Sequence, residues 1–240
     1  MTSPAYDAVA EWYDSTVQAG TNSFAVEPLL RLVGDVQGQL VCDLATGQGI
    51  VARELVRRGS RVVGADISRK LLEIARRLER EERLGIVYVH CDAQGSLPLQ
   101  DASLDGVTCN VALADIPDLT ATVGDVARAL RPGGWFAFAV THPCFQTPES
   151  GWQIDADGRP SRRVRAYFRE GFWRSDNPHG VRGRVGAHHR TLGTYINAFA
   201  DAGLVIERLD EPRPTEAPVV RAPAYDEVPT LLVARCRKVE

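Results

Sequence analysis

Short apolar runs alternate with longer amphipathic segments along most of this chain. Five runs have the length and composition of buried strands, at residues 40–44, 61–65, 86–90, 106–110 and 135–140. Apolar residues recur at helical spacing in the segments 50–58, 69–83 and 119–130. Strand and helix signals that alternate in this way predict βαβ units and a parallel sheet with helices on both faces.

Each predicted helix has a chemical signal at its boundary. Gly59 follows the first helix, Ser68 can cap the second, and the sequence Arg-Pro-Gly-Gly at 131–134 ends the third. Right-handed crossovers then produce a doubly wound sheet, with a ligand crevice at the carboxyl ends of its strands.

Further elements are predicted on both sides of this region. Two short helices at 5–18 and 24–32 precede the first strand. After residue 190 we expect a helix at 191–202 and strands at 204–209 and 230–237. The link between these two strands contains Pro212, Pro214, Pro218, Pro223 and Pro229. A link so rich in proline is typical of a surface loop that joins neighbouring, antiparallel strands.

The segment 144–190 breaks the alternation. It contains nine arginines, five acidic residues and no lysine, together with Trp152, Tyr167, Phe168, Phe172 and Trp173. Such a long irregular insertion is usually functional or mobile. One interpretation is a lid that stacks a planar, anionic small molecule on its aromatic side chains and pairs it with guanidinium groups. The alternative is a solvated cap or a contact in a homodimer.

Composition describes an ordinary globular protein. The chain has 240 residues, of which 44% are hydrophobic and 25% charged, and its net charge of −3 favours neither nucleic acid nor an anionic membrane as partner. We find no membrane-spanning run and no signal peptide, so we expect a cytoplasmic protein. Its five cysteines form no C-x-x-C pair, which favours reduced thiols over disulfides or a zinc site, and we expect no metal.

The segment 41–49 joins an apolar strand to a glycine turn and carries Asp43 at the junction. Such a turn lets backbone N–H groups approach a ligand that a Cβ would block. Residues 47–52 fit the dinucleotide pattern G-x-G-x-x-A, and Asp66 follows at the spacing of a ribose-binding acid, which suits NAD. Asp43 argues against NAD, because a carboxylate beside a pyrophosphate is unfavourable, whereas it suits the ammonium group of S-adenosylmethionine.

At this point the chain resembles the class I S-adenosylmethionine-dependent methyltransferases. The first motif of that family has an acid and then small residues at every second position, here Asp43, Ala45, Gly47 and Gly49, with Ala45 in place of a glycine. Acids after the next two strands match Asp66 and Asp92. The sequence Leu-Arg-Pro-Gly-Gly at 130–134 matches the entry to the fifth strand of the family. The order and spacing of these segments over residues 39–140 make the resemblance specific.

This resemblance implies a fold and a domain organisation. The fold is a Rossmann-like, doubly wound, seven-stranded α/β sheet, mostly parallel with an antiparallel last strand, and a lid is inserted before the sixth strand. Residues 1–240 then form a single methyltransferase domain. Its parts are N-terminal helices at 1–36, a cofactor-binding core at 37–143, an inserted lid and acceptor-binding segment at 144–190, and a C-terminal helix and strands at 191–240.

The resemblance also implies a role for each residue at the strand ends. Asp43 serves the methionine ammonium, directly or through water, and backbone amides around Ala45, Thr46, Gly47 and Gly49 face the methionine carboxylate. Asp66 accepts both ribose hydroxyls, Asp92 accepts from the adenine amino group, and Ala93 donates its N–H to the ring. Ile67 packs on the adenine, and Asn110 and Val111 line the methionine side. Tyr13, in a helix like the N-terminal helix of the family, closes over the cofactor or packs in the core.

Four of the five histidines lie between residues 142 and 189. His142 ends the fifth strand, at the crevice where acceptors bind in this fold, and is our first candidate for a general base or a substrate-orienting group. His188 and His189 precede the next helix and can fold over the pocket. A base is needed only if the acceptor must lose a proton.

We therefore predict a methyltransferase that moves a methyl group from S-adenosylmethionine to an oxygen or nitrogen of a small molecule by in-line displacement, leaving S-adenosylhomocysteine as product. The acceptor is expected to be aromatic or anionic. Two alternatives stay open. One is a protein that binds S-adenosylmethionine for other chemistry or for regulation, and the other is an NAD-dependent oxidoreductase.

Overall fold

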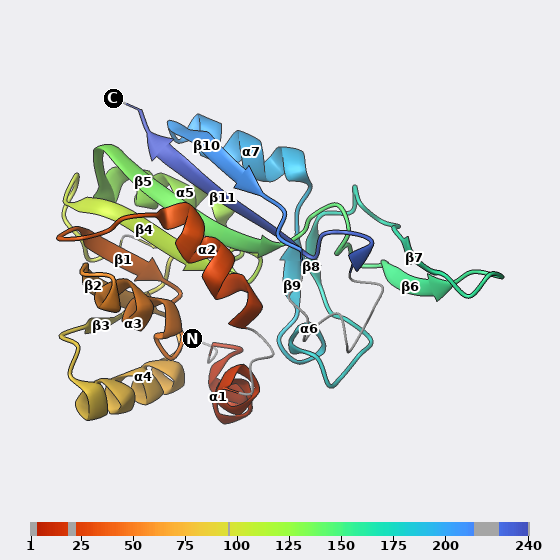
Figure 1. The fold of residues 1–240 in the computed structure, drawn as a ribbon, viewed down its shortest axis with the longest axis horizontal. Helices are drawn as coiled ribbons and strands as arrows, with labels where there is room; N and C mark the ends of the chain where they lie inside the picture. Colours follow the sequence, from red (N-terminus) through yellow and green to blue (C-terminus); the bar gives the residue numbers. More distant parts are fainter. Residues whose placement is uncertain (1–3, 19–22, 96, 214–225, 240) are drawn as a thin grey trace.

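A seven-stranded sheet forms the centre of the protein, with strand order β10-β11-β5-β4-β1-β2-β3 (Figure 1). The computed structural model describes residues 4–18, 23–95, 97–213 and 226–239. The strands are β1 (Leu40–Leu44), β2 (Arg61–Asp66), β3 (Val87–His90), β4 (Leu104–Asn110), β5 (Leu130–Thr141), β10 (Leu204–Asp210) and β11 (Leu231–Lys238). β11 runs antiparallel to both of its neighbours, and the other pairings are parallel. This arrangement confirms the predicted mostly parallel sheet with an antiparallel last strand.

Helices cover both faces of the sheet (Figure 1). They are α2 (Val26–Val33), α3 (Ile50–Arg57), α4 (Arg69–Glu82), α5 (Leu119–Ala129) and α7 (Leu192–Asp201), whereas α1 (Ala10–Gln18) packs against α4. Short 3₁₀ turns at Asp7–Val9 and Ser23–Ala25 precede α1 and α2. Buried side chains of α2, α3 and α4 share one apolar core with the sheet, and those of α5 and α7 share the other.

Strict alternation along β5 separates the two cores. Phe136 and Phe138 belong to the core under α5 and α7, where both contact Phe199 with ring centroids 6.0 and 4.7 Å away. Ala137 and Ala139 belong to the opposite core, under α2. Both faces of this strand are buried, so an apolar run without polar interruptions is what the sheet requires here.

The predicted helix starts and stops are mostly confirmed. The Oγ of Ser68 accepts from the N–H of Leu71 and caps α4, and the Oδ1 of Asp118 accepts from the N–H of Ala121 and caps α5. The end of α5 differs, because strand pairing resumes already at Leu130. Residues 131–134 then bulge between the pairs Leu104–Leu130 and Gly106–Trp135 before regular pairing continues.

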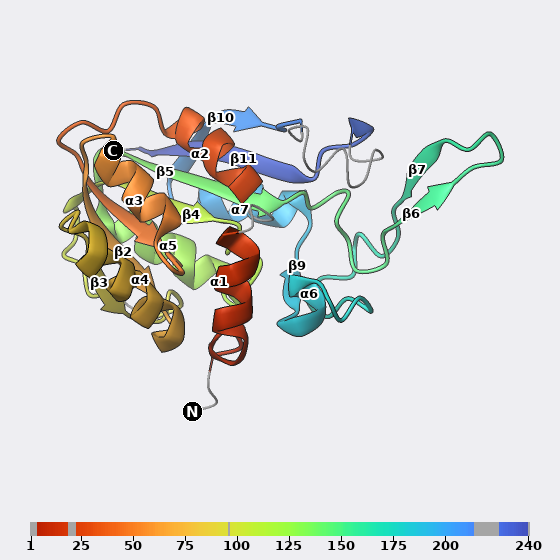
Figure 2. The same cartoon turned by 60° about the horizontal axis from the view of Figure 1, so that its bottom comes forward.

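The insertion at 144–190 contains more regular structure than its sequence suggested. Its elements are β6 (Gly151–Ile154), β7 (Pro160–Arg163), β8 (Gly171–Trp173), α6 (Val181–Arg184) and β9 (Ala187–His189). β6 and β7 form a hairpin that projects away from the sheet, whereas α6 lies beside α1 (Figure 2). Pairing of β8 with β9 joins residues far apart in the segment, and a local sequence pattern cannot reveal such pairing.

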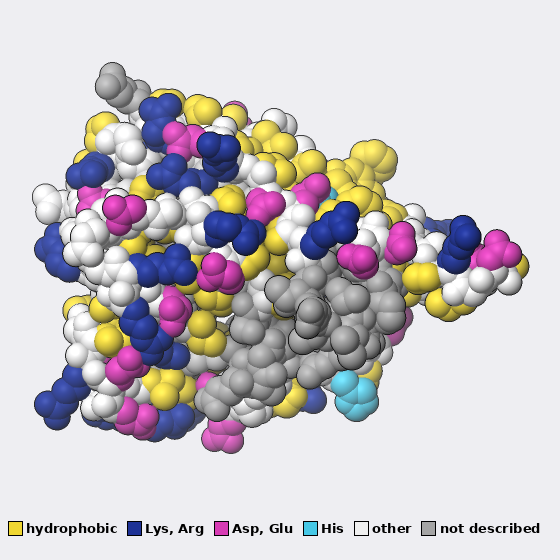
Figure 3. Space-filling view, viewed as in Figure 1, with side chains coloured by type: hydrophobic (Ala, Val, Ile, Leu, Met, Phe, Trp, Pro, Cys, Tyr) yellow, Lys and Arg dark blue, Asp and Glu magenta, His cyan; other side chains and the backbone are white. Residues whose placement is uncertain are grey.

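Both signs of charge are mixed over the described part of the face in Figure 3, with Lys and Arg side chains next to Asp and Glu. None of the described helices is both long and apolar enough to cross a bilayer.

Of the prolines in the link between β10 and β11, Pro214, Pro218 and Pro223 lie outside the described residues.

Candidate functional site

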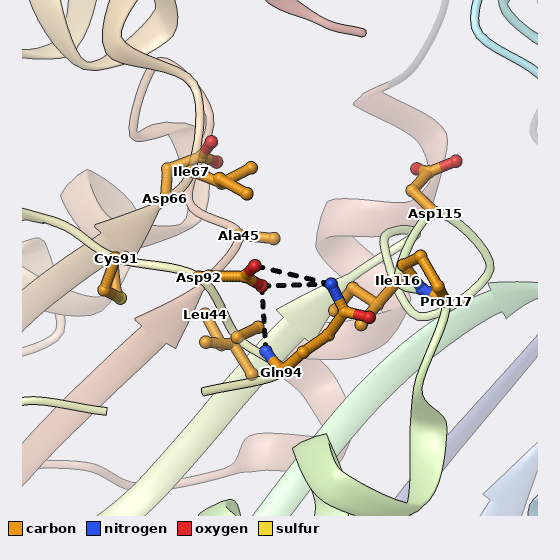
Figure 4. A pocket seen from close by; sticks show the side chains of 12 residues that line it. Leu44, Ala45, Asp66, Ile67, Cys91, Asp92, Gln94, Asp115, Ile116 and Pro117 are labelled. Atoms are coloured by element: carbon orange, nitrogen blue, oxygen red, sulfur yellow. Dashed lines mark hydrogen bonds between the residues drawn. The ribbon is translucent and has the colours of Figure 1, made fainter. Parts of the chain in front are cut away.

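The loops at the carboxyl ends of β1, β2, β3 and β4 surround a cavity of about 530 Å³. The N-terminal segment and the lid close its other side through residues such as Tyr6 and Gly186. Eight of the twelve predicted cofactor residues line this cavity: Tyr13, Ala45, Gly47, Asp66, Ile67, Asp92, Asn110 and Val111. Ala93 lines an adjoining recess of about 80 Å³ that shares several of these residues (Figure 4). Asp43, Thr46 and Gly49 are not among the residues that line either space.

Asp66 ends β2 and places a buried carboxylate in the cavity wall. Its Oδ2 accepts from the N–H of Gly47 at 2.8 Å, and its Oδ1 accepts from the N–H of Ser68 at 2.7 Å. Burial raises the pKa of Asp66, and the two N–H groups oppose that rise. Each carboxylate oxygen has two lone pairs, so both oxygens can accept a further hydrogen bond from a ligand.

Asp92 and Gln94, which follow β3, form another part of the wall of the recess. The Oδ1 of Asp92 accepts from the backbone N–H of Gln94 at 3.0 Å, and the side-chain amide of Gln94 reaches the same carboxylate (Figure 4). Ile67 is 40% exposed although it is a large apolar residue. An exposed isoleucine in the wall of a cavity offers an apolar surface to a ligand.

Asp43 lies behind the cavity wall instead of in it. Its Oδ2 accepts from the hydroxyl of Thr46 at 2.6 Å and its Oδ1 from the hydroxyl of Thr108 at 2.8 Å. Burial raises the pKa of Asp43 to about 6, whereas both hydroxyl bonds lower it. The prediction of a direct contact between Asp43 and a ligand therefore finds no support in this geometry, and an indirect action through Thr46 is what the bonds allow.

The raised pKa of Asp43 predicts a specific pH dependence of stability. An acid with a higher pKa in the folded than in the unfolded state weakens the fold as it ionises. The free energy of unfolding is therefore expected to fall by about 2–3 kcal/mol between about pH 4 and pH 7 on this account. An Asp43→Asn variant has no carboxylate to ionise at this position. The difference between its melting temperature and that of wild type should therefore shift in favour of the variant as pH rises. If the melting temperatures of both proteins changed in parallel with pH, the raised pKa of Asp43 would be contradicted.

Two residues in the cavity wall have left-handed backbone without being glycine. Ala45 has φ +54°, and Val111, which is β-branched, has φ +55°. This conformation costs about 1–2 kcal/mol for an L-residue, and such strain gathers at functional sites. Ala45 occupies the position where the resembled family has a glycine, so the substitution is tolerated at a cost in strain.

Replacing Ala45 by glycine is therefore expected to stabilise the protein. Relief of the strain outweighs the extra freedom of glycine in the unfolded chain, and we expect a gain of about 0.5–1 kcal/mol in urea denaturation. Ala65→Gly is the matched control, because Ala65 is buried in β2 and is absent from the residues with positive φ. Equal losses of stability in both variants would contradict the proposed strain.

Asn110 and the N-terminal tyrosines Tyr6 and Tyr13 also line the cavity. The Oδ1 of Asn110 is buried and accepts no hydrogen bond from the described residues. Tyr13 packs edge-to-face on Tyr6, with ring centroids 5.2 Å apart. An unsatisfied buried acceptor is costly, so Asn110 marks a place where a ligand can donate.

The three predicted histidines do not line this cavity. His142 is 2% exposed, its Nδ1 accepts from the N–H of Cys144, and its Nε2 is 2.7 Å from Glu211. Burial lowers the pKa of His142, and Glu211 opposes this. His188 and His189 line a separate space of about 20 Å³, where the Nε2 of His189 lies 2.7 Å from the carbonyl oxygen of Tyr167. A general base among these residues stays a prediction, without support from the geometry.

The lid and the loop after β4 are joined by contacts that the sequence did not reveal. Arg190, only 7% exposed, donates to the carbonyl oxygens of Leu113, Ile116 and Pro117 at 3.0, 2.6 and 2.7 Å. The N–H of His188 donates to the carbonyl oxygen of Ala114. These bonds hold the loop that forms one wall of the cavity.

A second set of contacts joins the lid to the N-terminal segment. Arg182 of α6 pairs with Asp115, whose Oδ2 also accepts from the hydroxyl of Tyr6 at 3.1 Å. The guanidinium of Arg184 lies 4.2 Å from the ring centroid of Trp12 in α1. No local pattern predicts these contacts, because they join three segments that are remote in the sequence.

Comparison with known proteins identifies the family. Residues 42–138 match the family model described as a methyltransferase domain. A solved S-adenosylmethionine-dependent methyltransferase from Mesorhizobium loti superimposes with a TM-score of 0.76 and 33% identity, covering 88% of this chain and 96% of that one.

Two curated relatives match over a shorter stretch. A demethylmenaquinone methyltransferase from Clavibacter sepedonicus is 34% identical over 138 residues, and a ubiquinone biosynthesis O-methyltransferase from Alkalilimnicola ehrlichii is 27% identical over 139 residues. The match spans 56% of this chain in both cases, and 55% and 56% of the two relatives. The cofactor S-adenosylmethionine, and not NAD, follows from the family and the solved structure together. The chain belongs to the S-adenosylmethionine-dependent methyltransferases.

Proposed function

We propose that this enzyme transfers the methyl group of S-adenosylmethionine to an oxygen or nitrogen of a small molecule, in a single domain whose segment 144–190 forms the lid over the acceptor. The observation that carries the proposal is the cavity of about 530 Å³ behind the strand ends, closed by the N-terminal segment and the lid. Small-molecule sites commonly have such volumes, and exclusion of water favours the displacement.

The cavity residues fit the cofactor in chemistry as well as in position. Asp66 keeps lone pairs free for two ribose hydroxyls, Asp92 and the N–H of Ala93 serve the adenine edge, and Ile67 packs on its face. The unsatisfied Oδ1 of Asn110 is suited to an N–H donor at the methionine end. When bound, the cofactor supplies an electrophilic methyl group on a sulfonium.

We assign Asp43 an indirect role. Its carboxylate holds the hydroxyls of Thr46 and Thr108, so it fixes the turn that follows β1 and adds negative charge behind it. The amides of the turn at 45–49 then serve the methionine carboxylate, and Tyr13 closes the far side. A buried carboxylate that costs stability is more common at functional sites than elsewhere.

A planar hydroxylated molecule is our proposed acceptor class. Two relatives carry names from menaquinone and ubiquinone biosynthesis, and one of them is named an O-methyltransferase. The relatives match over little more than half of their length, and the cavity of this chain supplies the structural support for this class. Aromatic residues at the closed side, such as Tyr6 and Tyr13, suit a planar ring.

Two measurements test the proposal separately. Titration calorimetry with S-adenosylhomocysteine tests the cofactor site, and absence of binding at millimolar ligand would refute it. Mass spectrometry of a panel of phenols, catechols and amines, incubated with enzyme and S-adenosylmethionine, tests the transfer. Binding of the cofactor product without methylation of any panel member would favour the alternative of a protein that binds the cofactor for other chemistry or for regulation.

A further inference from the structure

Asp115 is a cavity-lining carboxylate that belongs to none of the family motifs. It lies in the loop after β4 and lines both the main cavity and its adjoining recess. Its side chain is 16% exposed. Figure 4 shows Asp115 across the recess from Asp66 and Ile67, so it lies away from the expected ribose site.

Two partners orient this carboxylate. Arg182 of the lid pairs with Oδ1, and the hydroxyl of Tyr6 donates to Oδ2 at 3.1 Å. Each oxygen retains acceptor capacity, because a carboxylate offers about four lone-pair sites and these partners occupy two. Contacts from the lid and from the N-terminal segment therefore orient the carboxylate of Asp115 in the wall of the cavity.

The surroundings of Asp115 identify this space as the acceptor end. Ala112, Val185 and Gly186 line the same cavity, together with the two N-terminal tyrosines. Apolar and aromatic walls with one convergent polar group are typical of sites for small organic ligands. Asp115 is the acidic residue at this end, and Asp66 lies across the recess from it (Figure 4).

We propose that Asp115 contacts the methyl acceptor and accepts the proton of its hydroxyl group, which makes a neutral hydroxylated molecule the substrate class and disfavours a carboxylate. This inference rests on the proposed function. As the proton moves to Asp115, the O–H electron pair stays on oxygen and an oxygen lone pair forms the bond to the methyl carbon. The sulfur keeps the pair of the bond that breaks, and Asp115 later releases the proton to water.

Two physical features support this role. Burial raises the pKa of Asp115, although Arg182 and Tyr6 oppose the rise, and a higher pKa makes the carboxylate a better proton acceptor. The pair with Arg182 also fixes the carboxylate, and a fixed base is more effective than a mobile one. Arg182 and Tyr6 are thus positioning residues for Asp115.

The test uses the enzyme saturated with S-adenosylhomocysteine and three ring probes: phenol, anisole and benzoate. Ligand-observed NMR measures the affinity of each probe. Phenol is expected to bind wild type about 10-fold tighter than anisole, because phenol can donate a charge-assisted hydrogen bond to Asp115, whereas anisole has no O–H to donate. Asp115→Asn should remove most of this preference and leave the affinity for S-adenosylhomocysteine within about threefold.

Further variants separate recognition from support of the fold. Tyr6→Phe removes one of the two groups that position the carboxylate and should weaken the preference for phenol only in part, because Arg182 still holds Oδ1. Asp176→Asn, which changes an exposed acid of the same lid, should behave as wild type. Unchanged phenol binding by Asp115→Asn, no saturable phenol binding by wild type, or tighter binding of benzoate than of phenol would each overturn the role of Asp115. If the wild-type enzyme did not bind S-adenosylhomocysteine, the proposed function would be overturned instead.

Discussion

Replacing Asp66 by alanine is expected to weaken the binding of S-adenosylhomocysteine by about 100-fold or more. The carboxylate can accept two ribose hydroxyls, and each hydrogen bond to a charged group contributes about 1.5–3 kcal/mol. The substitution also frees the N–H groups of Gly47 and Ser68, which the carboxylate now holds at 2.8 and 2.7 Å, so the turn that faces the cofactor loses its anchor. Titration calorimetry measures the effect directly.

Two further variants make this result interpretable. Asp66→Asn keeps one acceptor oxygen and should lose less affinity than alanine does. Asp92→Ala changes an acid that is solvent-exposed, so we expect a loss of roughly 10-fold or less. If Asp66→Ala bound as tightly as wild type while remaining folded, the ribose assignment would be wrong.

Replacing Arg190 by methionine is expected to lower the free energy of unfolding by about 3–5 kcal/mol. Methionine fills similar space but cannot donate, so the carbonyl oxygens of Leu113, Ile116 and Pro117 lose their partner in a buried place. Each unsatisfied carbonyl costs about 1–3 kcal/mol. For a protein of this size the melting temperature should fall by roughly 6–20 °C.

The matched control is Arg169→Met, in the same lid. Arg169 pairs with Glu149 at 2.7 Å, but both side chains are largely exposed, so a change below about 1 kcal/mol is expected. Arg190→Lys should recover part of the loss, because an ammonium can donate to some of the carbonyls. If Arg190→Met and Arg169→Met were equally stable, the bonds of Arg190 would contribute little. Weaker binding of S-adenosylhomocysteine in Arg190→Met would further connect the loop to the cavity.

Much of the fold could be predicted because its signals are local. Apolar runs bounded by Gly59, by Ser68 or by the residues at 131–134 marked strands and helices that the structure confirms to within a few residues. The lid was different, because its short strands form a hairpin and a pair between residues 171 and 189. Pairing of that kind depends on partners that are remote in the sequence, and the periodicity of apolar residues along the chain does not reveal them.

The candidate site shows the same contrast between local signals, which could be predicted, and contacts between remote segments, which could not. Residues at strand ends were predicted because parallel strands bring their carboxyl ends to one edge of the sheet, and Asp66, Asp92 and Asn110 do line one cavity. Position in the sequence could not tell which way a side chain points. Asp43 and His142 both end strands, yet each is enclosed by other partners, Thr46 and Thr108 for Asp43 and Glu211 for His142.

The sequence by itself determined the order of strands and helices, the glycine turn and the acids at the strand ends, and these were enough to indicate the cofactor. Only the tertiary structure decided that Asp115 faces the cavity, that Arg182 and Tyr6 hold it, and that Arg190 fixes the loop beside it. The physical reason is the range of the interactions involved. Propensity and capping act within a few residues of chain, whereas a buried carboxylate or guanidinium is defined by partners from segments that meet only after folding.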